Sequence, residues 1–456
     1  MIKKYQPVFY TLLAALLLSV SMGLYNNFPI LYPDSAAYLA SGIMNQLPND
    51  RPIFYGWFLR HTHMMDNLFL SIFAQGLLAT LVIYLFFYYF SPARHRLVHF
   101  LISIFLLTIL TGYSFFVSYL MPDIFTALFL LSLAIILFAD VKKPHLWFLI
   151  PLCIYSVILH NSHFLIFFIS LIVLGIWLMI KRKSGLLPFS MKRWLIVLGM
   201  FVTGVVFSVA VNYAYTKKIF LSQKSHVFFM SRMHEVGILS RFLDLKCIQA
   251  NYSLCAYKDS MTHDFIWDPA SPFYKTGGWE SSEVEYNQMI RELLTTPRFI
   301  KDILVAWFFS TVQQLGSFEI EPQGRNHLTY IEETFPAHKY QMNVSMQNRE
   351  NGRLSFDKIN ERQHIFVYGS FIILVLLLLF YRKWTGQHRQ LVIFLLWAIV
   401  INAFVCSAFS TVLTRYQGRV IFIIPLILLV ILPAIDFRAL FSAWMHNRSD
   451  GDSKLY

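Results

Sequence analysis

Long apolar stretches recur along this chain, and they constrain its fold more than any other feature of the sequence. Nearly all of them are about 20 residues long, enough for one helix to cross a hydrocarbon core of roughly 30 Å. Hydrophobic residues make up 57% of the 456 residues and charged residues only 14%, which lies outside the usual composition of soluble domains. The sequence therefore predicts an integral membrane protein.

We expect an all-α polytopic fold with about ten transmembrane helices. They are predicted at 8–30, 66–90, 97–118, 122–139, 145–160, 164–180, 194–215, 364–381, 391–410 and 420–436. The first stretch is too long for a removed signal peptide and lacks a small-residue cleavage site, so we expect it to remain as helix one. The expected organisation is a transmembrane core over 1–216, an inserted outer domain over 217–363, C-terminal helices over 364–437 and a cytoplasmic tail over 438–456.

The charges of the short loops predict how these helices are oriented, because loops rich in Lys and Arg stay in the cytoplasm. With the N-terminus inside, the cytoplasmic segments carry 17 Lys and Arg, and the short outer segments carry four. Topology thus accounts for most of the net charge of +13, and no nucleic-acid partner is implied.

The segment 217–363 differs from the rest in carrying 17 Lys and Arg together with 17 Asp and Glu. By helix parity it lies outside, and its short elements are expected to be mixed and mostly helical. Within it, 299–318 is predicted to be an amphipathic helix at the membrane interface, because its apolar run is short and contains Gln313 and Gln314.

The four cysteines divide between the two kinds of segment. Cys153 and Cys406 fall in or near predicted membrane helices, where we expect them to pack as inert side chains. Cys247 and Cys255 flank "IQANYSL" in the outer domain. We predict a disulfide between them in an oxidising compartment, with two free thiols as the alternative.

Charged side chains are absent from the middle of every predicted helix and collect in the short outer loops. These loop residues are Asp34, Arg51, Arg60, Asp66, Asp123, Arg415 and Arg419. Transporters and pumps usually place ionisable groups near the midplane of the membrane. The distribution therefore favours an enzyme that acts on a lipid-borne substrate at the level of the headgroups.

Several of these residues lie in short motifs. "YPDSAAYLASG" places Asp34 just after helix one, "RPIFYGWFLR" follows it, "YLMPDIFTALF" places Asp123 in the next outer loop, and "TRYQGRVIFIIPLI" precedes a late helix. In these features the chain resembles the C-type (GT-C) membrane glycosyltransferases. The resemblance implies a GT-C-like core, a catalytic first outer loop over 31–65, an acidic residue in each of the two loops and a polyprenyl-phosphate sugar donor.

The function that this resemblance implies is transfer of a sugar to a glycan or lipid acceptor on the periplasmic face of a bacterial inner membrane. The first loop carries Pro-Asp-Ser in place of the Asp-Glu pair of the O-mannosyltransferases, and the "WWDYG"-type motif of the oligosaccharyltransferases is missing, so protein sequon glycosylation is not expected. A transporter or flippase for a lipid-linked saccharide remains an alternative, as does a polymerase or ligase of lipid-linked glycans.

The two acidic residues have both a catalytic and a structural interpretation. Asp34 is the best candidate for the base that takes the acceptor proton, and it is also placed to cap the helix that "PDSAAYLASGIM" predicts. Asp123 is the second catalytic candidate, and its charge also favours the start of the following helix. Together they are candidates to hold a divalent cation, Mg²⁺ or Mn²⁺, and the sequence leaves metal and no metal open.

The four outer arginines are candidates to bind the donor phosphate, since a guanidinium offers paired donors to phosphate oxygens. The alternative is that they extend to the anionic headgroups of membrane lipids. Arg415 and Arg51 are the preferred phosphate ligands, followed by Arg60 and Arg419.

Aromatic and histidine side chains near these motifs are assigned to substrate binding. They are Tyr38, Tyr55 and Tyr416 in the quoted motifs, and His160 and His163 in "LHNSHFL". The two histidines are three residues apart and can share one helical face as acid–base groups or ligands, with interfacial hydrogen bonding as the alternative.

The outer domain contains the aromatic loop "HDFIWDPASPFYKTGGWE". Trp267, Tyr274 and Trp279 lie there beside Asp264 and Asp268, a combination that suits a sugar or glycan acceptor. Loops that pack on a membrane interface have the same composition. Trp267 and Trp279 are therefore assigned to the acceptor, with membrane packing as the alternative.

Overall fold

The computed structural model describes residues 2–64, 66–183, 189–324, 329–350, 352–381 and 386–435. The fold is all-helical, with 76% helix and no strand among these residues, so the predicted all-α class is confirmed. Two isolated bridges, Ile30–Tyr119 and Gln323–Leu354, are its β-type pairings. The predicted tail 438–456 lies outside the described residues.

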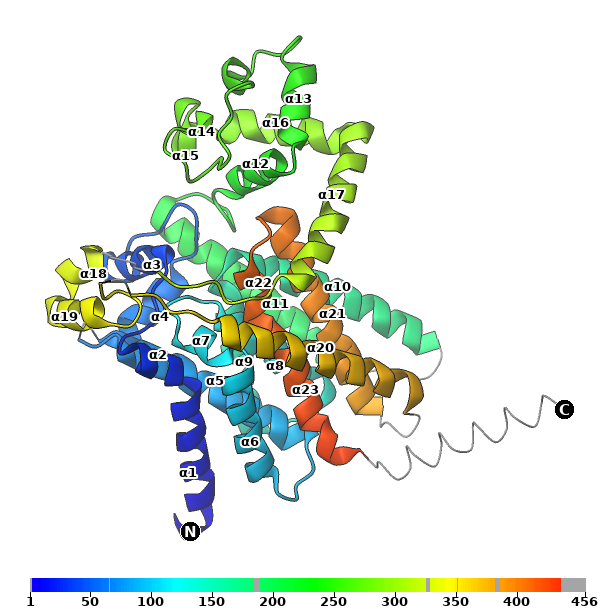
Figure 1. Ribbon diagram of the computed structural model, residues 1–456. Helices are drawn as coiled ribbons and strands as arrows, with labels where there is room; N and C mark the ends of the chain where they lie inside the picture. Colours follow the sequence, from blue (N-terminus) through cyan, green and yellow to red (C-terminus); the bar gives the residue numbers. More distant parts are fainter. Residues whose placement is uncertain are drawn as a thin grey trace.

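The helices follow one another along the chain as shown in Figure 1. Their order is α1 (Ile2–Ser19), α2 (Ser21–Asn26), α3 (Pro33–Met44), α4 (Phe54–His63), α5 (Phe69–Phe90), α6 (Arg96–Leu110), α7 (Tyr113–Ser118), α8 (Ile124–Phe138), α9 (Lys143–Ile158), α10 (Asn161–Lys183), α11 (Met191–Thr216), α12 (Ser225–Glu235), α13 (Ile238–Lys246), η1 (Ser253–Tyr257), α14 (Pro272–Lys275), α15 (Gly278–Ser281), α16 (Glu283–Thr295), α17 (Pro297–Gly316), α18 (Thr329–Thr334), α19 (Pro336–Val344), α20 (Asp357–Phe380), α21 (Gly386–Phe409), α22 (Thr414–Ile421), α23 (Ile423–Ile431) and η2 (Leu432–Ala434).

Six helical stretches are long and apolar enough to cross a membrane, and the protein is a multi-pass membrane protein. They are α5, α10 over Asn161–Lys181, α11, α20, α21 and the run Thr414–Ala434 that contains α22 and α23. Four shorter apolar helices, Gln6–Ser19 within α1 together with α6, α8 and α9, lie where the other four crossings were expected. Ten crossings therefore stay a prediction.

Two of the expected helices are interrupted. The stretch 8–30 ends as α1 at Ser19 and continues as the short α2, and 97–118 is divided into α6 and α7 by an extended Thr111. Backbone amides find side-chain partners at both breaks: the Met22 and Gly23 amides donate to the hydroxyls of Ser114 and Ser118 at 3.0 Å and 2.9 Å, and the Gly112 amide donates to Gln363 Oε1 at 2.7 Å. These tertiary hydrogen bonds replace those of a continuous helix.

The buried side chains form two hydrophobic cores. The second core contains buried residues between Val227 and Ile303 and is built from α12, α13, η1 and α14 to α17, which stand together at the top of Figure 1. Cys247 and Cys255 are bonded at its edge, as predicted. Apolar side chains from 318–356 belong instead to the main core, with α1 to α11 and α20 to α23.

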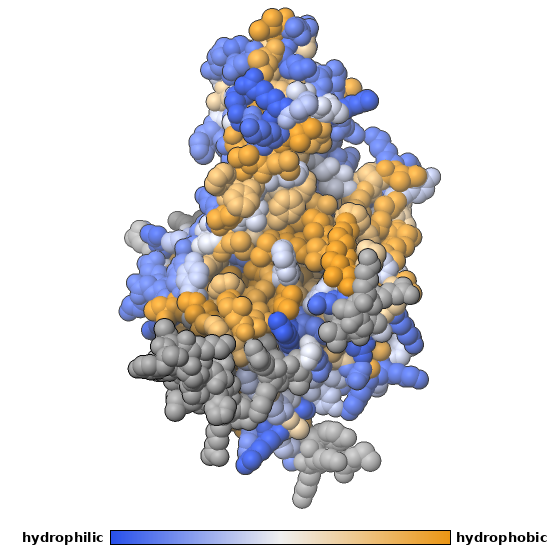
Figure 2. All heavy atoms as spheres, turned by 90° about the vertical axis from the view of Figure 1, so that its right-hand side faces the viewer, coloured by the Kyte–Doolittle hydropathy of each residue, from blue (hydrophilic) through white to orange (hydrophobic). Residues whose placement is uncertain are grey.

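Helix α17 connects the two cores. Phe299 and Ile303 in its first half are buried in the second core, and Gln314 near its end is buried against the segment before α22. Leu304, Val305, Phe308, Phe309 and Val312 are exposed on α17. Figure 2 shows broad apolar surface across the middle of the molecule and up toward the second core. The expected interfacial role of 299–318 stays a prediction.

The first loop folds into a tight helical pair, α3 and α4, beside α7. A Cβ added to Gly42 would lie 2.0 Å from the Gly56 carbonyl oxygen, so the two helices meet at positions that only glycine can fill. Just before α3, Ile30 pairs with the chain after α7: its amide donates to Ser118, and its carbonyl accepts from Leu120. This pairing holds the start of α3 against the start of α8.

Candidate functional site

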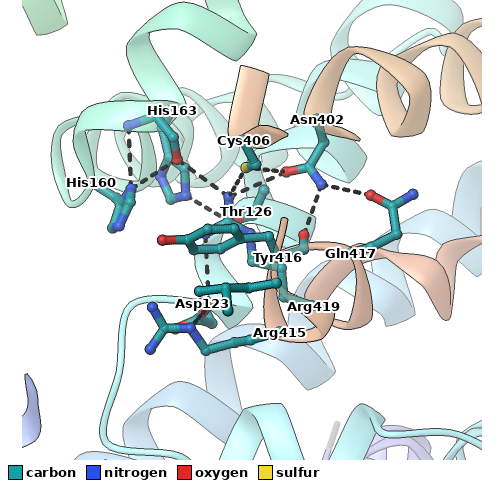
Figure 3. Close-up of polar contacts among 12 residues, drawn as sticks. Asp123, Thr126, His160, His163, Asn402, Cys406, Arg415, Tyr416, Gln417 and Arg419 are labelled. Atoms are coloured by element: carbon teal, nitrogen blue, oxygen red, sulfur yellow. Dashed lines mark hydrogen bonds and ion pairs between the residues drawn. The ribbon is translucent and has the colours of Figure 1, made fainter. Parts of the chain in front are cut away.

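Five charged residues from four chain segments meet in what we call the ionic cluster. They are Asp34 at the start of α3, Arg51 before α4, Asp123 before α8, and Arg415 and Arg419 on α22. Figure 3 shows Asp123 with the two α22 arginines. The predicted acids and three of the four predicted arginines therefore come together, although 381 positions separate the first from Arg415.

The guanidinium of Arg415 lies between the two carboxylates. Its Nη1 is 3.9 Å from Asp34 Oδ2, and its Nε is 3.8 Å from Asp123 Oδ1. Arg419 approaches the same Asp123 oxygen at 3.6 Å. Arg51 binds Asp34 more closely, at 3.1 Å, and also Asp50, at 2.6 Å. Three cations thus surround two carboxylates at the centre of the cluster.

Burial distinguishes the two carboxylates. The side chain of Asp123 is 3% exposed and that of Arg419 is 1% exposed, whereas Asp34 is 28% exposed. A charge this deeply buried is retained only with compensating partners. Asp123 therefore anchors the two α22 arginines, and Asp34 is the carboxylate that a substrate can reach.

Several buried donors of the cluster have no hydrogen-bond partner among the described residues. They are Arg51 Nη1, Arg415 Nε, Arg415 Nη1 and Arg419 Nε. Leaving a buried donor unsatisfied costs about 1–3 kcal/mol, and more for a charged group. A group with several negatively charged oxygens, such as a phosphate, matches these donors in charge and geometry.

Aromatic rings support the same guanidinium groups. Arg51 lies over Tyr38 at 4.9 Å, and Arg415 lies over Tyr32 at 4.4 Å and beside Tyr416 at 5.3 Å. Cation–π contacts of this kind strengthen when they are desolvated. Tyr38 and Tyr416 thus act on the arginines, which gives a physical basis for their assignment to the site.

Burial and neighbouring charge set the ionisation of the first loop. Burial raises the pKa of the Tyr38 hydroxyl well above its ordinary value, so the ring stays neutral. Burial alone would lower the pKa of Arg51, but the hydrogen bond to Asp50 and the charges of Asp34 and Asp50 outweigh it, and the net shift is upward. Arg51 is therefore a permanent cation.

Asp34 does not cap its helix. Tyr32 occupies the N-cap position of α3, and Ser35 Oγ accepts a hydrogen bond from the Tyr32 amide at 3.0 Å. Asp34 lies in the first turn, where its charge still favours the helix dipole. The expected capping contact is made by other groups, which leaves the Asp34 oxygens directed to the arginines.

The two predicted histidines differ in environment (Figure 3). His163 is fully buried and bonded on both nitrogens, to the Thr126 hydroxyl at 2.6 Å and to the Ser156 carbonyl at 2.7 Å. His160 contacts the Ser162 hydroxyl, which accepts a hydrogen bond from Arg419. Only His160 is therefore linked to the ionic cluster through a single side chain.

Other predicted site residues lie outside the cluster. Arg60 is exposed and donates to the Gly42 carbonyl, and Tyr55 is fully buried with its hydroxyl donating to Gln75. Trp267 and Trp279 contact one another at 6.0 Å on the second core, in the part of Figure 1 that stands away from α3 and α22. The structure does not bring them to the carboxylates.

Besides Ser162, which accepts a hydrogen bond from Arg419, four more residues that contact the cluster were missed from the sequence. Asp50 neighbours Arg51, Tyr32 stacks under Arg415, and Asn402 and Cys406 from α21 approach Arg419 Nη2 at 3.2 Å and 3.3 Å. Asn402 gave a usable signal, because a lone amide in an apolar helix marks a polar contact. Nothing in the sequence distinguished Cys406.

The sequence left open whether Asp34 and Asp123 hold a divalent cation together with donor phosphate oxygens, and that cation stays a prediction. Mg²⁺ is usually bound by one or two carboxylates, with waters and substrate phosphates as its other ligands. Here the Arg415 guanidinium already lies between Asp34 and Asp123, and the described residues contain no group of three or more His, Cys, Asp or Glu side chains arranged to hold a metal. The positive charge between the carboxylates is that of arginine.

No protein-family model matches the chain, and comparison with curated proteins and with solved structures found no match.

Proposed function

We propose that this protein is a membrane glycosyltransferase that moves a sugar from a polyprenyl-phosphate donor to a glycan or lipid acceptor. The observation that carries the proposal is the set of buried guanidinium donors around one accessible carboxylate. These donors have no hydrogen-bond partner among the described residues, and those of Arg415 make only long ion pairs, at 3.8 Å and 3.9 Å. Phosphate oxygens satisfy those donors, and the apolar belt of the molecule brings a lipid-borne phosphate to the level of the spanning helices. The GT-C-like motifs described above support the same reaction.

Each part of the cluster has a role in this reaction. Asp34 takes the proton of an acceptor hydroxyl as its oxygen forms a bond to the anomeric carbon of the sugar. The bond from that carbon to the phosphate oxygen breaks, and the polyprenyl phosphate leaves with the electron pair. Arg415, Arg419 and Arg51 stabilise the negative charge on the leaving phosphate. Attack from the face opposite to the phosphate inverts the anomeric configuration.

The distribution of buried charge favours this enzyme over a transporter. Within the described part of the six spanning helices, the buried acidic or basic side chains are Arg419, which belongs to the cluster, and His163, which lies near the start of α10. A transporter would need ionisable or polar groups near the midplane of the bundle. A polymerase or ligase of lipid-linked glycans would use similar chemistry on a diphosphate donor.

We further propose that the N-terminus is cytoplasmic and that the cluster faces the periplasm of a bacterial inner membrane, with ten crossings. The asymmetry of 17 against four basic residues in the short loops supports this orientation. Reporter fusions after Arg193 should read cytoplasmic, and fusions near Gly277 should read periplasmic. The reverse result at either site would contradict the proposed topology.

Replacing Asp34 with Asn tests the proposed reaction. The substitution keeps the shape of the side chain and removes its charge, so transfer should fall by the roughly 10²–10⁴ expected for loss of general base catalysis. The product is first identified by comparing the surface glycans of a deletion strain and its parent by mass spectrometry, and transfer is then measured with reconstituted protein.

Asp66→Asn is the matched control, since Asp66 is an exposed acid on the same loop. Expression and thermal stability should stay close to the parent values in both variants, and transfer should fall only in the first. Transfer by Asp34→Asn within a few-fold of the parent would remove the carboxylate from the mechanism.

A further inference from the structure

Three fully buried glutamines lie beside the segments that carry the ionic cluster. They are Gln75 on α5, Gln314 on α17 and Gln347 after α19, and each has 0% exposure. Each uses both the oxygen and the nitrogen of its amide to bind groups of the site segments. Such amides in an apolar interior are retained only when all their hydrogen bonds are made.

Gln347 holds the segment that leads to Asp34. Its Oε1 accepts from the Leu31 amide at 3.0 Å, and its Nε2 donates to the Leu31 carbonyl at 2.8 Å. One side chain thus pairs with both backbone groups of one residue, as a neighbouring strand would. Leu31 precedes Asp34 by three residues, so this contact fixes where α3 begins.

Gln314 holds the segment that leads to Arg415 in the same way. Its Oε1 accepts from the Leu413 amide at 3.0 Å, and its Nε2 donates to the Leu413 carbonyl at 2.7 Å. Leu413 precedes Arg415 by two residues and is the N-cap residue of α22. The contact therefore sets the position at which α22, with both of its arginines, begins.

Gln75 holds the segment that leads to Asp123. Its Nε2 donates to the carbonyls of Val117 and Tyr119, at 2.8 Å and 3.0 Å, and its Oε1 accepts from the Tyr55 hydroxyl at 2.6 Å. Tyr119 precedes Asp123 by four residues. Tyr55, which does not reach the cluster itself, contributes through this amide.

We propose that Gln75, Gln314 and Gln347 are positioning residues that set the relative placement of Asp123, Arg415 and Asp34. The inference rests on the proposed function, because it concerns the same site. The three segments that carry Asp34, Asp123 and Arg415 are far apart in the sequence. Each is fixed by a glutamine amide from a different part of the chain. Misplacement of a reacting group by about 1 Å lowers rates by roughly 10²-fold, so contacts of this kind matter for activity beyond their effect on folding.

Gln363 on α20 provides a matched control. It is also fully buried and pairs with two backbone groups: its Oε1 accepts from Gly112 at 2.7 Å, and its Nε2 donates to Phe318 at 2.9 Å. Neither backbone group lies within four residues of a cluster residue. Gln363→Leu therefore reproduces the cost of removing a buried amide whose two backbone partners do not lead directly into a cluster residue.

The test compares Gln314→Leu, Gln347→Leu and Gln75→Leu with Gln363→Leu in the full-length protein. Thermal unfolding midpoints and dissociation constants for a short-chain polyprenyl phosphate are measured in detergent, and transfer is scored by recovery of surface glycan in the deletion strain. All four variants should lose thermal stability to a similar extent. Gln314→Leu and Gln75→Leu should weaken phosphate binding about tenfold, and Gln363→Leu should stay within threefold of the parent.

Gln347→Leu should separate binding from transfer. It loosens the segment that carries Asp34 and leaves the arginines in place. The dissociation constant for polyprenyl phosphate should therefore stay within threefold of the parent, while glycan recovery falls at least tenfold. Where a leucine variant does not fold, the asparagine variant replaces it, because the shorter amide cannot reach both backbone groups.

Two outcomes overturn the inference in different ways. If the parent protein binds polyprenyl phosphate and the three site variants match Gln363→Leu in binding and in transfer, the glutamines only stabilise the fold and the proposed function stands. If the parent itself does not bind polyprenyl phosphate, the proposed function fails and the positioning role fails with it.

Discussion

The ionic cluster and the surface of the second core both pair acids with bases, and they do so in opposite ways. On the second core, Glu292 accepts from Lys246 at 2.7 Å and from the Tyr252 hydroxyl at 2.6 Å, so each of its oxygens has a close partner in a partly exposed position. In the cluster, Asp123 is almost fully buried, and its nearest cations stand 3.6 Å and 3.8 Å away.

The difference indicates which charges serve the fold and which serve a ligand. Close, partly exposed pairs contribute little free energy but cost little to form. Buried charges whose counter-ions lie far away destabilise the fold unless further groups bind them. A site for an anionic ligand is therefore recognised in this molecule by good burial combined with incomplete pairing, and not by the best ion-pair geometry.

The largest effect should follow from Asp123→Asn. Removing this carboxylate leaves Arg419 buried without its counter-charge, and breaking a buried pair from one side costs about 3–5 kcal/mol of unfolding free energy. Denaturant unfolding in detergent measures it. Asp140→Asn is the control, because the Asp140 carboxylate that pairs with Arg193 is itself fully exposed and its loss should leave the midpoint unchanged. Equal losses of unfolding free energy in the two variants would contradict the distinction between the buried cluster and the exposed pairs.

Loss of the disulfide should come next and should affect the second core alone. Cys247 and Cys255 are eight residues apart, and closing a loop of that size stabilises a fold by roughly 2–3 kcal/mol in the chain-entropy estimate. The double serine variant should unfold the second core at lower temperature, as followed by proteolysis near α13. Its affinity for polyprenyl phosphate should match that of the parent, and a parallel loss of affinity would show that the two regions are coupled.

Arg415→Lys should have a moderate effect on binding. The ammonium keeps the charge but loses the forked donors that span the two carboxylates and the ligand. We expect the dissociation constant for polyprenyl phosphate to rise about tenfold, which corresponds to about 1.4 kcal/mol. Isothermal titration in detergent measures it. An unchanged dissociation constant would mean that only the positive charge at position 415 contributes to phosphate binding.

The smallest effect should come from the surface pair, and it should depend on pH. Hydrogen bonds from Lys246 and Tyr252 hold the pKa of the Glu292 carboxyl below its usual value. The pair therefore stabilises the fold above the unfolded pKa of about 4.3 and loses this contribution as the pH falls through the lower folded pKa. Glu292→Gln should cost less than about 1 kcal/mol at pH 7, and the difference from the parent should shrink in acid. A difference that persists in acid would assign the effect to packing.

The sequence predicted the parts of the fold that depend on composition and spacing. The apolar stretches predicted the membrane class and the helical content, and the spacing of Cys247 and Cys255 predicted their bond. The charged loops predicted that Asp34, Asp123 and the arginines would share one side, because parity and the Lys and Arg counts constrain loop placement. Their meeting in one cluster did not follow from this, because Arg60 is predicted on the same side and lies outside the cluster.

Other features depended on contacts that no local pattern encodes. The break at Thr111 is stabilised by Gln363, which lies about 250 residues later in the chain. The spacing of Arg419, four residues after Arg415, did not indicate that its side chain is almost fully buried. The buried His163 forms a hydrogen bond with Thr126, which lies on another helix. Partners distant in sequence determine these environments, so neither propensity nor spacing reports them.

The separation of the cluster residues along the chain also has a consequence for biosynthesis. Asp123 emerges from the ribosome about 300 residues before Arg419, an interval of roughly 15–60 s at usual elongation rates. During that time the carboxylate has neither of its α22 counter-ions. We therefore expect the segment before α8 to reach its final packing only after α22 has been synthesised.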